Sequence, residues 1–191
     1  MSLIFAVQIA AAQKNNPYVT AIKAYQKNYA ATHEVVKGKD KKYFRFFPVN
    51  KGLLADCSFE KITDTIGFVM KTSAATLQYY FKYGVLKFAL RGVPCSLYVY
   101  QGKDLMNTEK YRDYLFVPFT DSTTGDESYG SGRYLEFYIP EIRNNHLMLD
   151  FNKAYNPYCA YATGYHCPIP PKENRLAVAV RAGEMVFGKK H

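Results

Sequence analysis

The first regular pattern in the chain is a run of apolar residues spaced three and four positions apart. It consists of Val19, Ile22, Tyr25 and Tyr29, with polar residues between them. Such spacing places the apolar side chains on one face of a helix. Asn16 suits the N-cap, and Pro17 suits the first helical position. The pattern therefore predicts an amphipathic helix over residues 17–32, lying across one face or one mouth of a sheet.

After a lysine-rich turn at residues 37–42 the apolar period changes to two, as in strands with one buried face. The candidate strands are residues 43–47, 53–59, 66–71, 86–90, 95–100, 114–119, 134–139, 147–151 and 176–180. Short turns separate several of them, namely Tyr83-Gly84, Arg91-Gly92 and Asn144-Asn145, so neighbouring strands should pair antiparallel. We expect one mainly β domain over residues 13–191, an antiparallel β-barrel or β-sandwich with one N-terminal helix.

The composition agrees with this fold class and excludes some partners. With 191 residues, 48% of them hydrophobic, the chain can bury a substantial core, and its 18 Tyr favour strands. A net charge of +9 could attract anionic partners, but the lysines are scattered and no nucleic-acid-binding module is visible. We expect no nucleic acid and no cofactor. The sequence leaves the oligomeric state open.

The first twelve residues resemble a truncated signal peptide. An apolar run over residues 3–12 ends in small residues, with Ala10 and Ala12 suited to signal peptidase and Gln13 as the mature start. No Lys or Arg precedes residue 14, which departs from the usual basic start of a signal. A frayed apolar end or a buried edge strand is the alternative. We expect an exported protein, periplasmic or extracellular, with no transmembrane segment.

Two pairs of cysteines call for different interpretations. Cys57 and Cys95 fall on the inward faces of their predicted strands and read as small core residues. Cys159 and Cys167 lie in a proline-rich segment, where a disulfide and two buried free thiols are both open. His166 next to Cys167 gives no common zinc spacing, so we expect no metal site.

Two segments concentrate polar residues without a regular period. Residues 121–134 contain three glycines and Arg133, which could bind an anion or simply form a hairpin loop with Arg133 in a salt bridge. Residues 150–175 combine acids, amides and tyrosines with four prolines that stiffen the chain. Here the alternative is a long buried loop whose polar side chains satisfy its own backbone.

We predict that polar groups from both segments converge in one cleft. The candidate ligand-binding residues are Asp121, Arg133, Asp150, Asn152, Tyr155, Tyr158, Glu173 and Asn174. Buried charges need partners, so Arg133 should approach at least one of the acids. The expected function is binding of a small polar or anionic ligand. The alternatives are a hydrolase that uses Arg133 with acids such as Asp150 and Glu173, and an envelope protein without a site.

The same segments carry a family resemblance. Residues 114–121, 124–134, 150–161, 165–175 and 182–184 resemble the bacterial family known as domain of unknown function 1684, with looser similarity at residues 43–48, 68–72 and 80–84. The chain is similar to the shorter exported members common in Bacteroidetes-type bacteria. The family has no established activity, so the resemblance implies no catalytic residues.

Overall fold

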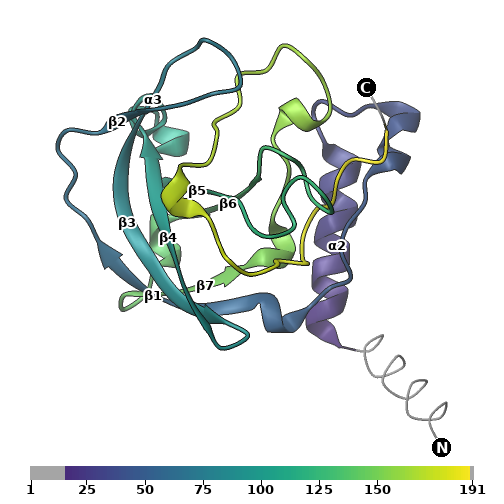
Figure 1. Ribbon diagram of the computed structural model, residues 1–191, viewed down its shortest axis with the longest axis horizontal. Coiled ribbons are helices and arrows are strands. Elements are labelled where there is room, and N and C mark those ends of the chain that lie inside the picture. Colours follow the sequence, from purple (N-terminus) through teal and green to yellow (C-terminus); the bar gives the residue numbers. More distant parts are fainter. Residues whose placement is uncertain (1–15, 190–191) are drawn as a thin grey trace, which may run out of the picture.

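The computed structural model describes residues 16–189, and in it seven antiparallel strands form one sheet curled into a half-barrel (Figure 1). The strands are β1 (Leu54–Lys61), β2 (Phe68–Met70), β3 (Gln78–Leu90), β4 (Val93–Gly102), β5 (Tyr114–Phe119), β6 (Arg133–Tyr138) and β7 (His146–Asp150). Their order is β6-β5-β4-β3-β1-β7, with β2 paired to β3. The predicted antiparallel β fold is thus confirmed. The predicted signal segment, residues 1–12, lies outside the described residues.

The N-terminal helix α2 (Pro17–Thr32) has the predicted bounds. Asn16 caps it by accepting a hydrogen bond from the Tyr18 amide at 3.0 Å. Val19 and Ile22 are buried, as the apolar period requires, and Figure 1 shows the helix on the side of the half-barrel away from β3 and β4. The short helix α3 (Lys103–Met106) follows β4. No helix among residues 16–189 is long and apolar enough to span a bilayer.

Strand β5 is buried on both faces, which the period of two did not lead us to expect, and β6 is buried on one face and at Tyr134 of the other. Leu115, Val117 and Phe119 point into the main core together with Leu135 and Phe137. The alternate positions belong to a second, aromatic cluster formed by Met70, Tyr80, Tyr100, Phe116 and Tyr134. The polar loops after β7 border this second face, and the candidate site described below lies there.

Two predicted strands are absent from the described sheet. Residues 43–47 make only irregular pairing with the C-terminal segment, where the Phe47 amide donates to the Gly183 carbonyl at 2.9 Å. Residues 176–180 run beside residues 120–122, and the Val180 amide donates to the Asp121 carboxylate at 3.2 Å. Both predictions were wrong because loop backbone and side chains, rather than neighbouring strands, satisfy these backbone groups.

Of the three predicted turns, two are hairpin turns and one is not. Arg91 and Gly92 adopt φ of 52° and 80°, and Asn144 and Asn145 adopt 52° and 60°, as tight turns between twisted strands require. Gly84 instead lies inside β3, next to a β-bulge. A Cβ there would come within 2.8 Å of the Glu60 carbonyl oxygen and would also meet the Phe59 ring. Glycine is needed at this position for close packing, not for a turn.

Candidate functional site

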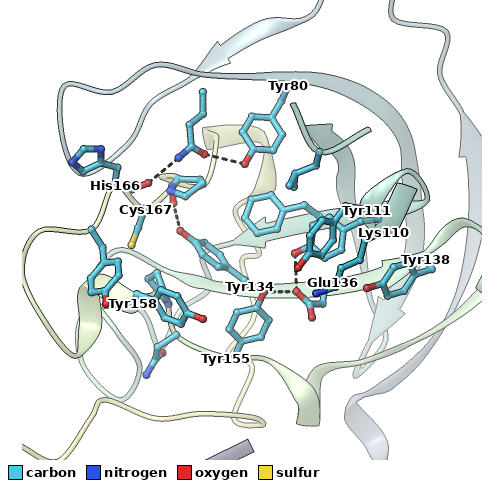
Figure 2. A pocket seen from close by; sticks show the side chains of 18 residues that line it. Tyr80, Lys110, Tyr111, Tyr134, Glu136, Tyr138, Tyr155, Tyr158, His166 and Cys167 are labelled. Atoms are coloured by element: carbon cyan, nitrogen blue, oxygen red, sulfur yellow. Dashed lines mark hydrogen bonds between the residues drawn. The ribbon is translucent and has the colours of Figure 1, made fainter. Parts of the chain in front are cut away.

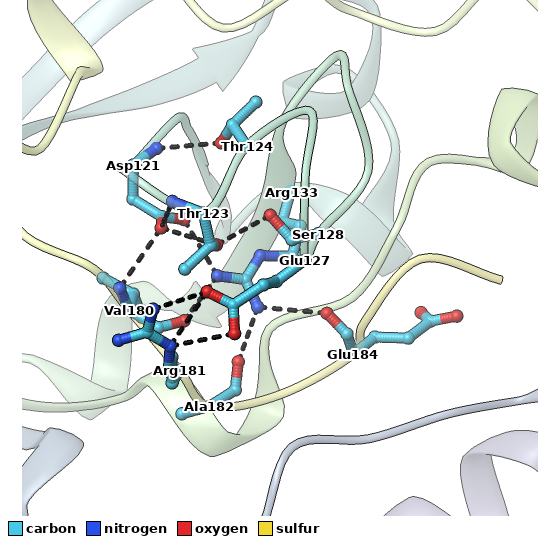
Figure 3. Close-up of polar contacts among 10 residues, drawn as sticks. All are labelled: Asp121, Thr123, Thr124, Glu127, Ser128, Arg133, Val180, Arg181, Ala182 and Glu184. Carbon is cyan, nitrogen blue, oxygen red and sulfur yellow. Dashed lines mark hydrogen bonds and ion pairs between the residues drawn. The ribbon is translucent and has the colours of Figure 1, made fainter.

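Asp121 and Arg133 form a fully buried ion pair (Figure 3). Arg133 Nη2 lies 2.9 Å from Asp121 Oδ2, and neither side chain is exposed. The guanidinium also donates to the carbonyl oxygens of Val180, Ala182 and Glu184, at 2.8, 2.5 and 3.0 Å. Arg133 therefore meets an acid, as predicted, but its terminal nitrogens bind the C-terminal segment and leave none for a ligand.

Asp150 and Asn152 leave the end of β7 together, as predicted, and they fasten helix α2. Tyr18 Oη donates to Asp150 Oδ1 at 2.9 Å and accepts from Asn152 Nδ2 at the same distance. Asn152 Oδ1 accepts from the Asn50 amide at 2.8 Å. These bonds link three segments that are far apart in the sequence.

Glu173 and Asn174 lie at a third place. Glu173 pairs with Lys82 at 3.1 Å on the surface. Asn174 is buried and bridges β4 and β5, because its Oδ1 accepts from the Tyr98 amide at 2.7 Å and its Nδ2 donates to the Pro118 carbonyl at 2.8 Å. One alternative for this segment was that its polar side chains satisfy buried backbone groups, and Asn174 does so.

The structure therefore distributes the eight predicted residues over several places instead of one cleft. Tyr155 and Tyr158 are the two that line a large hollow on the second face of the sheet. We call this hollow, of about 590 Å³, the tyrosine cleft (Figure 2). Its lining residues are Gln78, Tyr80, Leu105, Lys110, Tyr111, Tyr114, Phe116, Tyr134, Glu136, Tyr138, Tyr155, Asn156, Pro157, Tyr158, Tyr165, His166, Cys167 and Pro168.

Strand register explains why the cleft is so rich in tyrosine. Tyr114 lies opposite Tyr138, and Phe116 lies opposite Glu136. Because alternate residues share a face, these side chains and Tyr134 all stand on the second face of β5 and β6. The sequence contained this signal, since Glu136 interrupts an otherwise aromatic alternation within a predicted strand. We did not single it out because one acid in a strand usually faces solvent.

Glu136 is the one acid among the residues that line the cleft. Its Oε2 accepts hydrogen bonds from Tyr114 Oη at 2.7 Å and from Tyr155 Oη at 2.6 Å, and Figure 2 shows the Tyr155 hydroxyl directed at the carboxylate. Burial, and next the charge of Glu136, raise the pKa of Tyr114, and burial raises that of Tyr155, so both remain donors. No group among residues 16–189 donates to Oε1. Two phenols thus orient the carboxylate and leave one oxygen for a ligand.

Cys159 and Cys167 form a disulfide bond beside the cleft, with 6.3 Å between their Cα atoms. From the sequence, a disulfide and two free thiols were both open, and the structure contains the disulfide. It closes the segment that carries Tyr165 and His166, and these two residues line the cleft. The free cysteines are Cys57, which is buried as predicted, and Cys95, which is half-buried. Among the described residues no cluster of His, Cys, Asp and Glu is arranged to hold a metal ion.

Comparison with known proteins gives a family and a solved structure of similar fold. The model of a family described as "Protein of unknown function (DUF1684)" matches residues 40–185. The solution NMR structure of an uncharacterised protein from Haloarcula marismortui is similar, with 27% identity and a TM-score of 0.65 over 88% of this chain and 94% of that one. No curated protein matches.

Proposed function

Because the chain belongs to the DUF1684 family, whose description assigns no activity, we propose a function from its own geometry: the tyrosine cleft binds a small polar organic molecule. The observation that carries this proposal is the Glu136 carboxylate, which two phenols hold in place with one oxygen unused. A cleft of about 590 Å³ is of the size that small-molecule sites have.

A buried acceptor at the cleft supports the proposal. Asn156 is fully buried, and its Oδ1 has no hydrogen-bond partner among the described residues. The amide orientation is fixed, because Nδ2 donates to the Met185 carbonyl at 2.8 Å. A buried carbonyl without a donor costs about 1 to 3 kcal/mol. Because this oxygen is inaccessible in the structure, a ligand hydroxyl or amine could provide that donor only if the wall of the cleft shifts to expose it.

The lining of the cleft carries one acid, Glu136, and one base, Lys110, so it offers no net positive charge to an anion. Glu136 would repel an anion, and Arg133, on which we based the anionic alternative, is buried and bound to Asp121. Arg133 and Glu173 do not line the cleft, which leaves the proposed hydrolase without its named groups there. The geometry supports binding best.

A substitution that fills the cleft tests the proposal. Leu105 lines the rim of the cleft, so Leu105→Trp should weaken binding of a small diol or amino alcohol at least about tenfold, or 1.4 kcal/mol. Leu77→Trp is the matched control, because Leu77 is 76% exposed and does not line the cleft. Ligand-observed NMR measures both. If Leu105→Trp leaves binding unchanged, the ligand binds elsewhere.

We also propose that the protein is exported. The apolar residues 3–12 end in small residues, and the disulfide between Cys159 and Cys167 suits an oxidising compartment. The intact mass of the protein isolated from its native envelope is expected to correspond to a chain that begins at Gln13. A chain that retains residues 1–12 would contradict the proposal.

A further inference from the structure

A second hollow adjoins the tyrosine cleft on the side of helix α2. It has a volume of about 290 Å³, and we call it the helix-side hollow. It is lined by Tyr25, Tyr29, Thr32, His33, Glu34, Glu136, Tyr155 and Tyr158. Glu136, Tyr155 and Tyr158 also line the tyrosine cleft, so the two hollows share these side chains as a common wall.

The helix-side hollow is negatively charged in a protein of net charge +9. Glu34 and Glu136 line it, and none of its lining residues is Lys or Arg. Burial, and next the charge of Lys37, lower the pKa of His33 to about 4, so the imidazole is neutral at pH 7. The hollow thus contributes two negative charges and no positive charge of its own.

The acids are held in place by tyrosines. Tyr158 Oη donates to Glu34 Oε2 at 3.0 Å, just as Tyr114 and Tyr155 donate to Glu136. Four of the lining residues are tyrosines, whose ring faces attract cations. A tyrosine ring of the adjoining cleft already contacts an ammonium group, because Lys110 Nζ lies 4.9 Å from the centre of the Tyr111 ring.

Two buried polar atoms without partners belong to residues that line the two hollows. Asn156 Oδ1 is an acceptor at the tyrosine cleft. His33 Nδ1 accepts from the amides of Val35 and Val36 at 3.3 and 3.0 Å, so the imidazole proton is on Nε2, which has no partner among the described residues. A ligand that carries both a strong donor and an oxygen atom would match these two atoms once the walls of the hollows shift to expose them.

From these observations we propose that the ligand is a small aliphatic amine that also carries a hydroxyl group. Its protonated amine lies between Glu136 and Glu34, against the tyrosine rings. An ammonium has three donors and a charge opposite to the carboxylates, whereas a neutral hydroxyl has one donor and no charge. This inference rests on the proposed function, because it names the ligand class of the same site.

A matched pair of probes tests the amine. Aminobutanol and butanediol differ only in that an ammonium replaces one hydroxyl. We expect NMR titrations to show aminobutanol binding about tenfold more tightly, and its affinity to fall as sodium chloride is added. The proposal of an amine ligand would be overturned if butanediol bound as tightly as aminobutanol, or if succinate bound more tightly than both. In either case the cleft would remain a binding site. If none of the probes shifts resonances of the cleft, both proposals fail.

Variants identify the acids that carry the preference. Glu34→Gln and Glu136→Gln should each reduce the preference for aminobutanol over butanediol several-fold, and the double variant should abolish it. Glu60→Gln is the control, because it removes one negative charge from an exposed pair with Lys87 outside both hollows. An equal loss in Glu60→Gln, or none in either hollow variant, would contradict the assignment. All three side chains are exposed, so amide spectra should show that the fold persists.

Discussion

Replacing Asp121 with asparagine is expected to lower the free energy of unfolding by about 3 to 5 kcal/mol. Asparagine has nearly the same shape but no charge, so the Arg133 guanidinium would remain fully buried without a counter-ion. Asp121 Oδ1 also accepts from the Thr123 amide and from the Val180 amide, at 2.8 and 3.2 Å. Urea denaturation followed by circular dichroism measures the loss.

An exposed pair on the same loop provides the control. Glu127 and Arg181 pair at 2.7 Å, but their side chains are 31% and 52% exposed. Because water screens such a pair, Glu127→Gln should cost less than about 1 kcal/mol. Similar losses for Asp121→Asn and Glu127→Gln would show that burial does not decide the strength of these ion pairs.

The second large effect concerns Glu184, whose carboxyl group should make stability fall as pH rises. The side chain is fully buried, and burial raises its pKa from 4.5 to about 7 although the Asn156 amide and Tyr161 hydroxyl bond to it. Between these two values the unfolded chain releases the proton and the folded chain keeps it. The contribution of Glu184 to stability is therefore greatest below pH 4.5 and falls by about 3 kcal/mol as pH rises to 7.

Glu184→Gln isolates this contribution. Glutamine cannot ionise, so the variant should gain stability relative to the parent protein as pH rises from 4 to 8. All other titrating groups are common to both proteins, which makes the difference in unfolding free energy the quantity to measure. A difference that stays flat over this range would contradict the raised pKa.

The elements predicted best are those whose signal is local. Helix α2 has its cap residue, its proline and its apolar period within one stretch of sequence, and the structure gives the predicted bounds. Strand β5 likewise has the predicted bounds, because bulky apolar residues fill both of its faces. The turn at residues 144–145 was visible from two consecutive asparagines, which tolerate positive φ.

The elements predicted poorly depend on partners far away in the sequence. Residues 43–47 are rich in aromatic side chains, as strands often are, but their backbone partner is the C-terminal segment, which no local pattern reveals. The polar loops were singled out correctly as unusual, but Arg133 and Asn174 satisfy buried groups of the fold. The role of Glu136 depends on the fold, because Tyr155, which lies in the loop after β7, donates a hydrogen bond to its carboxylate.

The central claim is that the tyrosine cleft is the ligand site, and crystals soaked with small polar molecules test it most directly. The soaking set would contain amines, diols and carboxylates of similar size. We predict that bound molecules gather in the cleft, with a donor atom within hydrogen-bonding distance of Glu136 Oε1. Bound molecules that gather elsewhere, with the cleft of the same crystals holding only water, would contradict the account.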